Sequence, residues 1–86
     1  MFDYLDIVKL KRDYQNLHKK PNEVDFLPRG SQGTIVMVYD ERVGSECYPT
    51  EYEVEFMNDE GETLAVVTLK GDDLVLVQAY GSIAAA

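Results

Sequence analysis

The chain has 86 residues, which is enough for one small domain with a modest core and too few for a two-domain cleft. Its 16 acidic and eight basic residues give a net charge of −8, which disfavours binding to nucleic acid or to an anionic membrane. No apolar run reaches the length of a membrane helix, the N-terminus does not resemble a signal peptide, and the single cysteine is Cys47. We therefore expect one cytoplasmic domain over residues 1–86.

The first predicted strand lies close to the N-terminus. Within residues 6–12, apolar Val8 and Leu10 alternate with lysines, which predicts a strand. A helix over residues 4–10 is the competing interpretation. The β-branched pair that begins with Ile7 favours the strand.

A long polar segment follows, from residue 13 to residue 32, and its prolines and glycine break regular structure. This segment is longer than most connections in compact domains, so part of it must pack against the core. We expect Val24, Phe26 and Leu27 to make that contact.

The next three elements form the centre of the predicted sheet. Residues 33–39 are β-branched and apolar on both faces, which predicts a central strand, and residues 51–56 alternate strictly between acidic and apolar side chains. Residues 58–61 read as a hairpin turn, with Gly61 at positive φ, before a return strand over residues 63–69.

The last elements complete a pattern of five short strands. Residues 71–73 predict a 3₁₀ turn, residues 74–79 a fifth strand and residues 80–86 a tail. A long first loop, a tight hairpin and a 3₁₀ break before the last strand predict a small all-β, SH3-like barrel with its core over about residues 5–79. Closure of the barrel would protect the sheet edges.

Four segments of these strands stand out in chain order: Asp6-Ile7-Val8-x-Leu10, Gly33-Thr34-Ile35-Val36-x-Val38-Tyr39, Tyr52-Glu53-Val54-Glu55-Phe56 and Gly61-x-Thr63-x-Ala65-x-Val67-Thr68-Leu69. The pattern resembles a family of small bacterial proteins known only as a domain of unknown function, and it covers about residues 5–77. The resemblance implies an SH3-like barrel, and it implies no reaction, cofactor or partner. The loops at 13–32 and 41–50 are longer than is usual in that family.

No group of residues has the spacing of a catalytic or metal-binding site. Asp59, Glu60 and Glu62 lack the alternation of a calcium loop, His18 has no second ligand, and Cys47 has no histidine at a known motif spacing. We therefore expect no enzymatic activity, no metal and no cofactor.

The hairpin over residues 51–69 is the predicted interaction surface. Its first strand presents a strip of three glutamates that would steer a basic partner. Its second strand is apolar on both faces, which leaves one apolar set outside the core. The predicted partner-binding residues are Glu51, Glu53, Glu55, Val67 and Leu69.

The facing of the return strand depends on the register of the turn. With a bulged three-residue loop, Val67 and Leu69 share the outer face with Glu53 and Glu55. A slip of one residue exchanges the two sets of side chains on this strand. In either register the strand presents apolar side chains outward, and a homodimer would bury this apolar set and keep the acids at its rim.

These features favour a protein-interaction module or small accessory subunit that docks a protein partner through the outer face of the hairpin. The first alternative is an antitoxin or immunity-type inhibitor whose acidic face masks a basic partner. The second is a nucleic-acid-binding module of the KOW type, which the net charge of −8 disfavours.

Overall fold

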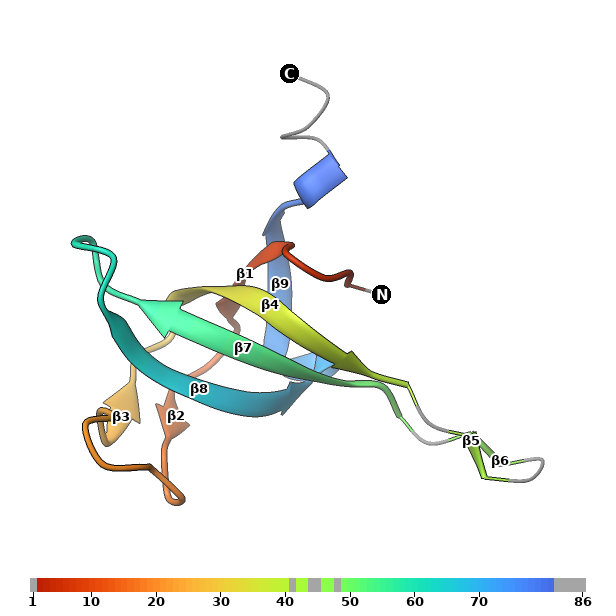
Figure 1. The fold of residues 1–86 in the computed structure, drawn as a ribbon, viewed down its shortest axis with the longest axis horizontal. Coiled ribbons are helices and arrows are strands. Elements are labelled where there is room, and N and C mark those ends of the chain that lie inside the picture. The colour runs from red at the N-terminus through yellow and green to blue at the C-terminus, as the bar shows by residue number, and fades with distance from the viewer. Residues whose placement is uncertain (1, 41, 44–45, 48, 82–86) are drawn as a thin grey trace.

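The computed structural model describes residues 2–40, 42–43, 46–47 and 49–81. The strands of its main sheet are β1 (Ile7–Leu10), β4 (Gln32–Tyr39), β7 (Glu51–Met57), β8 (Thr63–Lys70) and β9 (Leu74–Gln78). They lie in the order β8–β7–β4–β1–β9, and every neighbouring pair is antiparallel (Figure 1).

The sequence predicted all five of these strands. The 3₁₀ turn η1 (Gly71–Asp73) precedes the last of them, and residues 7–10 form a strand and no helix, as expected. Strands β8 and β9 are the two edges of the sheet, and no ladder joins them among the described residues. The predicted all-β class is confirmed, and the sheet is an open one.

Two short ladders lie outside the main sheet. Strands β2 (Tyr14–Gln15) and β3 (Phe26–Leu27) pair within the long segment after β1, and β5 (Arg42–Val43) pairs with β6 (Glu46–Cys47) in a hairpin that projects from the end of β4 (Figure 1). Of the three predicted anchors, Leu27 is buried in the core and Val24 packs against it. The prediction for Phe26 is wrong, because its neighbour takes the inward position and leaves Phe26 47% exposed.

Alternate side chains of the main strands point to one side of the sheet and form a single core. Strand β7 shows this most clearly, because Tyr52, Val54 and Phe56 are buried and the glutamates between them are not. Gly33 on β4 lies opposite Phe56, and a Cβ there would lie 2.7 Å from Val54 Cγ1 and 2.8 Å from the Glu55 carbonyl oxygen. The buried apolar residues are Val8, Leu10, Leu27, Ile35, Tyr52, Val54, Phe56, Ala65, Val67, Leu69 and Leu74.

The N-terminal segment covers one end of this core. The Phe2 ring packs edge-on against Tyr52 with 5.3 Å between centroids, and the Phe2 N–H donates to the Tyr52 hydroxyl (3.1 Å). The buried Asp6 carboxylate accepts hydrogen bonds from the backbone N–H groups of Asp3 (2.8 Å) and Tyr80 (3.0 Å). Asp6 therefore ties the start of the chain to the residues that follow β9.

The long segment between β1 and β4 covers the open side of edge strand β8. The Val24 N–H donates to the Leu64 carbonyl (3.0 Å), and Glu23 Oε2 accepts from the Val66 N–H (3.0 Å). Glu23 Oε1 accepts from the Lys20 N–H (2.9 Å). These backbone hydrogen bonds, with Lys20 first, lower the pKa of Glu23 below its ordinary value of 4.5. One side chain and one amide thus occupy backbone groups that an edge strand leaves unpaired.

The turn glycine generates the first prediction. Gly61 has φ +82°, and a Cβ there meets nothing within 4 Å, so a side chain would strain the backbone without a clash. We expect Gly61→Val to lower the free energy of unfolding by about 1–2 kcal/mol in chemical denaturation. Gly81→Val is the control, since Gly81 has equal space and no positive φ. Equal stability of the two variants would contradict the proposed strain.

The hydrogen bonds of Glu23 generate the second prediction. Because folding lowers the pKa of this carboxylate, its contribution to stability is present above pH 4.5 and is lost as the pH falls through the folded-state pKa. We expect Glu23→Gln to destabilise the protein at neutral pH, and the difference from the native chain to shrink in acid. Thermal unfolding of both chains, from neutral pH to below pH 4.5, measures this difference in stability. Glu60→Gln removes the same charge from an exposed turn position. A matching pH dependence in both variants would show that net charge alone is responsible.

Candidate interaction surface

The outer face of β4, β7 and β8 carries the side chains that do not enter the core. On β7 these are Glu51, Glu53 and Glu55, since their apolar neighbours point inward. On β8 the residues opposite them in the ladder are Lys70, Thr68 and Val66. The predicted acidic strip therefore exists as one file along the middle strand of a three-strand surface, which we call the acidic face. The residues of this face are Thr34, Met37, Tyr39, Glu51, Glu53, Glu55, Val66, Thr68 and Lys70.

The prediction that Val67 and Leu69 lie on this face is wrong. Their exposed fractions are 6% and 4%, and they pair across the sheet with Val54 and Tyr52 inside the core. The register is the one-residue alternative that the sequence left open, which turns Val66 outward instead.

The turn itself explains this register. Met57 pairs with Thr63, so residues 58–62 lie between the paired strands, and the ladder is irregular between Phe56 and Met57. Asn58 Oδ1 accepts from the N–H groups of Glu60 and Glu62, both at 2.9 Å. Because the Asn58 side chain accepts hydrogen bonds from two amides, it stabilises this turn, which is longer than the three-residue loop considered from the sequence. The bulge next to the turn shifts the pairing of β7 and β8 by one position.

Hydrogen bonds from neighbouring strands hold two of the three glutamates in place. The Tyr39 hydroxyl donates to Glu53 Oε2 (3.2 Å), and the Thr63 hydroxyl donates to Glu55 Oε2 (2.6 Å). Partial burial, and then the bond to Glu53 and its negative charge, raise the pKa of Tyr39 above 10.0. The phenol is therefore protonated at neutral pH and acts as a hydrogen-bond donor.

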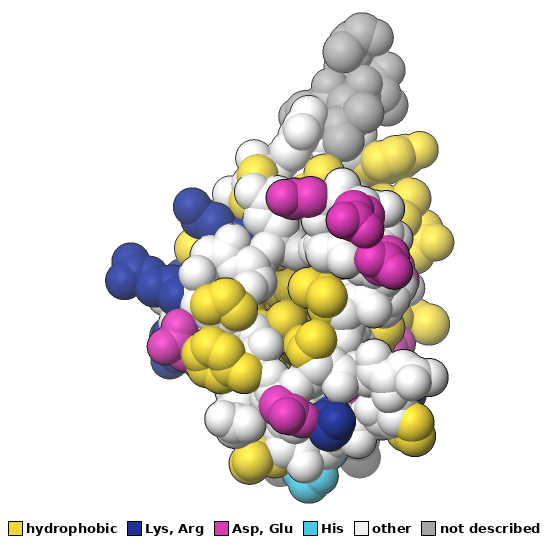
Figure 2. Space-filling model, turned by 90° about the vertical axis from the view of Figure 1, so that its left-hand side faces the viewer, with side chains coloured by type: hydrophobic (Ala, Val, Ile, Leu, Met, Phe, Trp, Pro, Cys, Tyr) yellow, Lys and Arg dark blue, Asp and Glu magenta, His cyan; other side chains and the backbone are white. Residues whose placement is uncertain are grey.

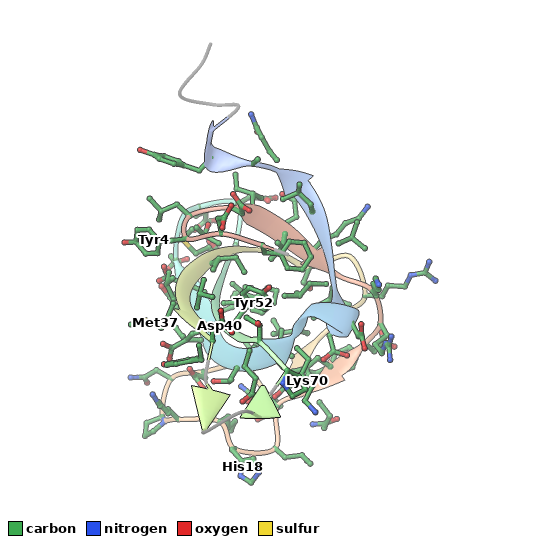
Figure 3. All side chains as sticks on the ribbon, turned by 90° about the vertical axis from the view of Figure 1, so that its right-hand side faces the viewer. Tyr4, His18, Met37, Asp40, Tyr52 and Lys70 are labelled. Atoms are coloured by element: carbon green, nitrogen blue, oxygen red, sulfur yellow. The ribbon has the colours of Figure 1, made fainter. Side chains whose placement is uncertain are left out.

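Strand β4 adds apolar surface beside the acids. Met37 and Tyr39 pair with Glu53 and Glu51 in the ladder, and they are 47% and 41% exposed. Figure 3 shows Met37 outside the curved sheet and Tyr52 inside it, in the middle of the strands. The sequence did not place Met37 on this surface, because β4 is apolar on both faces and its pattern does not show which face is outward.

A hollow of about 560 Å³ lies at the end of the sheet near the turn. Figure 2 views the molecule from this side and shows hydrophobic side chains gathered at the centre of the face, with acidic side chains above them. Among the described residues that line the hollow, Asp59 alone is titratable, so these residues offer no acid–base pair. Its lining residues are Ile7, Gly30, Ser31, Gln32, Gly33, Thr34, Met57, Asn58, Asp59 and Leu64.

In the part of the chain that the structure describes, no three histidine, cysteine or acidic side chains gather in a way that would hold a metal ion. No helix in this part is long and apolar enough to cross a membrane. Cys47 lies in β6, whose side chains are outside the described part.

Comparison with known proteins gives the family and nothing more specific. No curated protein and no solved structure matches the chain. A family model described as a domain of unknown function, DUF4926, matches residues 4–76, which is most of the chain and includes every strand of the acidic face. The protein therefore belongs to the DUF4926 family.

Proposed function

We propose that this protein is a non-enzymatic interaction module that binds a basic surface of another protein through its acidic face. The observation that carries the proposal is the file of Glu51, Glu53 and Glu55, bordered by exposed Met37 and Tyr39. Lys70 is the one basic residue on strands β4, β7 and β8. A surface of this kind attracts a basic partner and offers apolar area beside its acids.

The residue types on the face support a protein partner. Tyrosine and methionine are enriched at protein interfaces, and tyrosine adds a rigid anchor with a polar tip. The hydrogen bonds from Tyr39 and Thr63 already restrict the Glu53 and Glu55 side chains. Less side-chain freedom is then lost on binding, which favours affinity.

The topology supports an SH3-like barrel as the finer description of the fold. Strand β1 lies between β4 and β9, a long segment separates β1 from β4, and the 3₁₀ turn η1 precedes β9. The long segment and the 3₁₀ turn are among the features from which the sequence predicted such a barrel. An accessory subunit and an inhibitor that masks a basic protein would both use the acidic face of this domain, and its net charge of −8 favours either over a nucleic-acid module.

The third prediction tests the acidic face with charge reversal. A partner isolated with the native chain from its host is titrated against Glu53→Lys and against Glu60→Lys. Both variants change the net charge equally, but Glu60 lies in the turn, away from the file. We expect Glu53→Lys to weaken binding about tenfold or more and Glu60→Lys to change it about twofold or less. Isothermal titration at two salt concentrations measures both effects.

Two outcomes would contradict the proposal. Equal weakening by both variants would show that net charge, and not this face, attracts the partner. Unchanged binding by Glu53→Lys would show that the partner docks elsewhere on the molecule.

A further inference from the structure

The two edge strands of the sheet differ in whether another segment covers their open side. The open side of β8 is occupied by Glu23 and Val24, as described above. Strand β9 pairs with β1 on one side, and among the described residues no strand or loop pairs with its other side. Figure 1 shows β9 running beside β1 at the end of the sheet. An uncovered edge is a template for another strand.

The exposed part of β9 is apolar. Val75, Leu76 and Val77 are 37%, 46% and 43% exposed, and the strand from Leu74 to Gln78 has no charge, proline or glycine. Natural sheets protect their edges with charged side chains and prolines, among other devices, and this strand has neither, which leaves its backbone groups available for pairing. Three consecutive exposed aliphatic side chains also offer area on both faces of the strand.

The direction of the backbone groups follows from one hydrogen bond. The Lys11 N–H donates to the Asp73 carbonyl (2.9 Å), so the backbone N–H and C=O groups of Asp73 point toward β1. The direction of these groups alternates along an antiparallel ladder. The backbone groups of Val75 therefore also point toward β1, whereas the N–H and C=O of Leu76 point to the open side.

We infer that β9 pairs with β9 of a second copy of this chain, in an antiparallel dimer with a two-fold axis at Leu76. A two-fold axis there places Leu76 opposite its own copy, where the two residues exchange both backbone hydrogen bonds. The same axis places Val75 opposite Val77 and Leu74 opposite Gln78. The strand is therefore complementary to itself, and every pair has at least one apolar side chain.

The charges near the edge permit this contact despite the net charge of the chain. The glutamates of β7 lie three strands from β9, about 14 Å at the usual strand spacing, which exceeds the screening length of about 8 Å at physiological salt. Asp73 is 3.9 Å from Arg12 Nη1, and the two-fold register places it beyond the apolar pairs. The acidic faces of both copies stay exposed.

The contact is small, so the dimer is weak. It uses five strand residues per copy, whereas a stable interface has about 20–30 residues per side. The ladder with β1 is also irregular at Val77, the extra residue of β9 between Leu76 and Gln78, and such a bulge twists the strand and shortens the segment that can pair. We expect the dimer to form only at protein concentrations on the order of hundreds of micromolar and above, which is typical of weak complexes.

Cysteine crosslinking tests the register of this dimer. In a Cys47→Ser background, Leu76→Cys brings two thiols together across the axis, since directly opposite residues have Cα atoms about 5.5 Å apart, within disulfide range. Met37→Cys is the matched control, because Met37 is 47% exposed and Leu76 is 46% exposed. We expect disulfide-linked dimers from Leu76→Cys under mild oxidation and several-fold fewer from Met37→Cys. Equal yields would overturn the inference.

Sedimentation velocity tests the association itself. We expect the weight-average sedimentation coefficient of the native chain to rise with concentration up to about 1 mM. Leu76→Lys should abolish the rise, because it places two like charges opposite each other, and Met37→Lys should not. A native chain that stays monomeric, or a Leu76→Lys chain that still dimerises, would overturn the inference. If Leu76→Lys fails to fold, the crosslinking comparison decides alone.

Discussion

The pairing register between β7 and β8 is the constraint on which the rest of the structure depends. Val54 lies opposite Val67 and Glu55 lies opposite Val66, so one side of the hairpin is wholly apolar and the other carries the acids. A shift of one residue would place Val66 in the core and expose Val67, with the same composition on a different surface. The longer turn at residues 58–62, organised by Asn58, fixes this register.

Two consequences follow from that register. The inner side chains complete a core that also holds Leu27 from the long segment and packs against Phe2 from the N-terminus. The outer side leaves the glutamates beside Met37 and Tyr39, which makes the acidic face a defined surface with hydrogen-bonded carboxylates. The surface on which the proposed function rests therefore depends on which face of the sheet each residue of the hairpin occupies.

The sequence predicted the strands because their signal is local. Alternation over residues 51–56 and β-branched runs elsewhere are sufficient to locate each strand and the turn glycine at Gly61. It predicted the three glutamates of the acidic face for the same reason, since acids that alternate with apolar residues must point outward. It failed at Val67 and Leu69, because β8 is apolar at both parities and the facing then depends on turn length alone.

Contacts between distant segments were also beyond the sequence pattern. The link from Glu23 to Val66 spans 43 positions, and the link from Asp6 to Tyr80 spans 74. Each uses one carboxylate to bind a backbone amide, and nothing in a local pattern distinguishes such a carboxylate from a solvated one. The prediction that Phe26 contacts the core is wrong, because two neighbouring apolar residues of a strand cannot both face the core.

The free energy of unfolding of Val67→Lys, compared with that of Thr68→Lys, tests the register most directly. Val67 is 6% exposed, and Thr68 is its exposed neighbour opposite Glu53. We expect Val67→Lys to lose about 3 kcal/mol or more, or not to fold, because it buries an unpaired charge, and Thr68→Lys to change stability by about 0.5 kcal/mol or less. A Val67→Lys chain as stable as Thr68→Lys would place Val67 on the outer face and contradict this register.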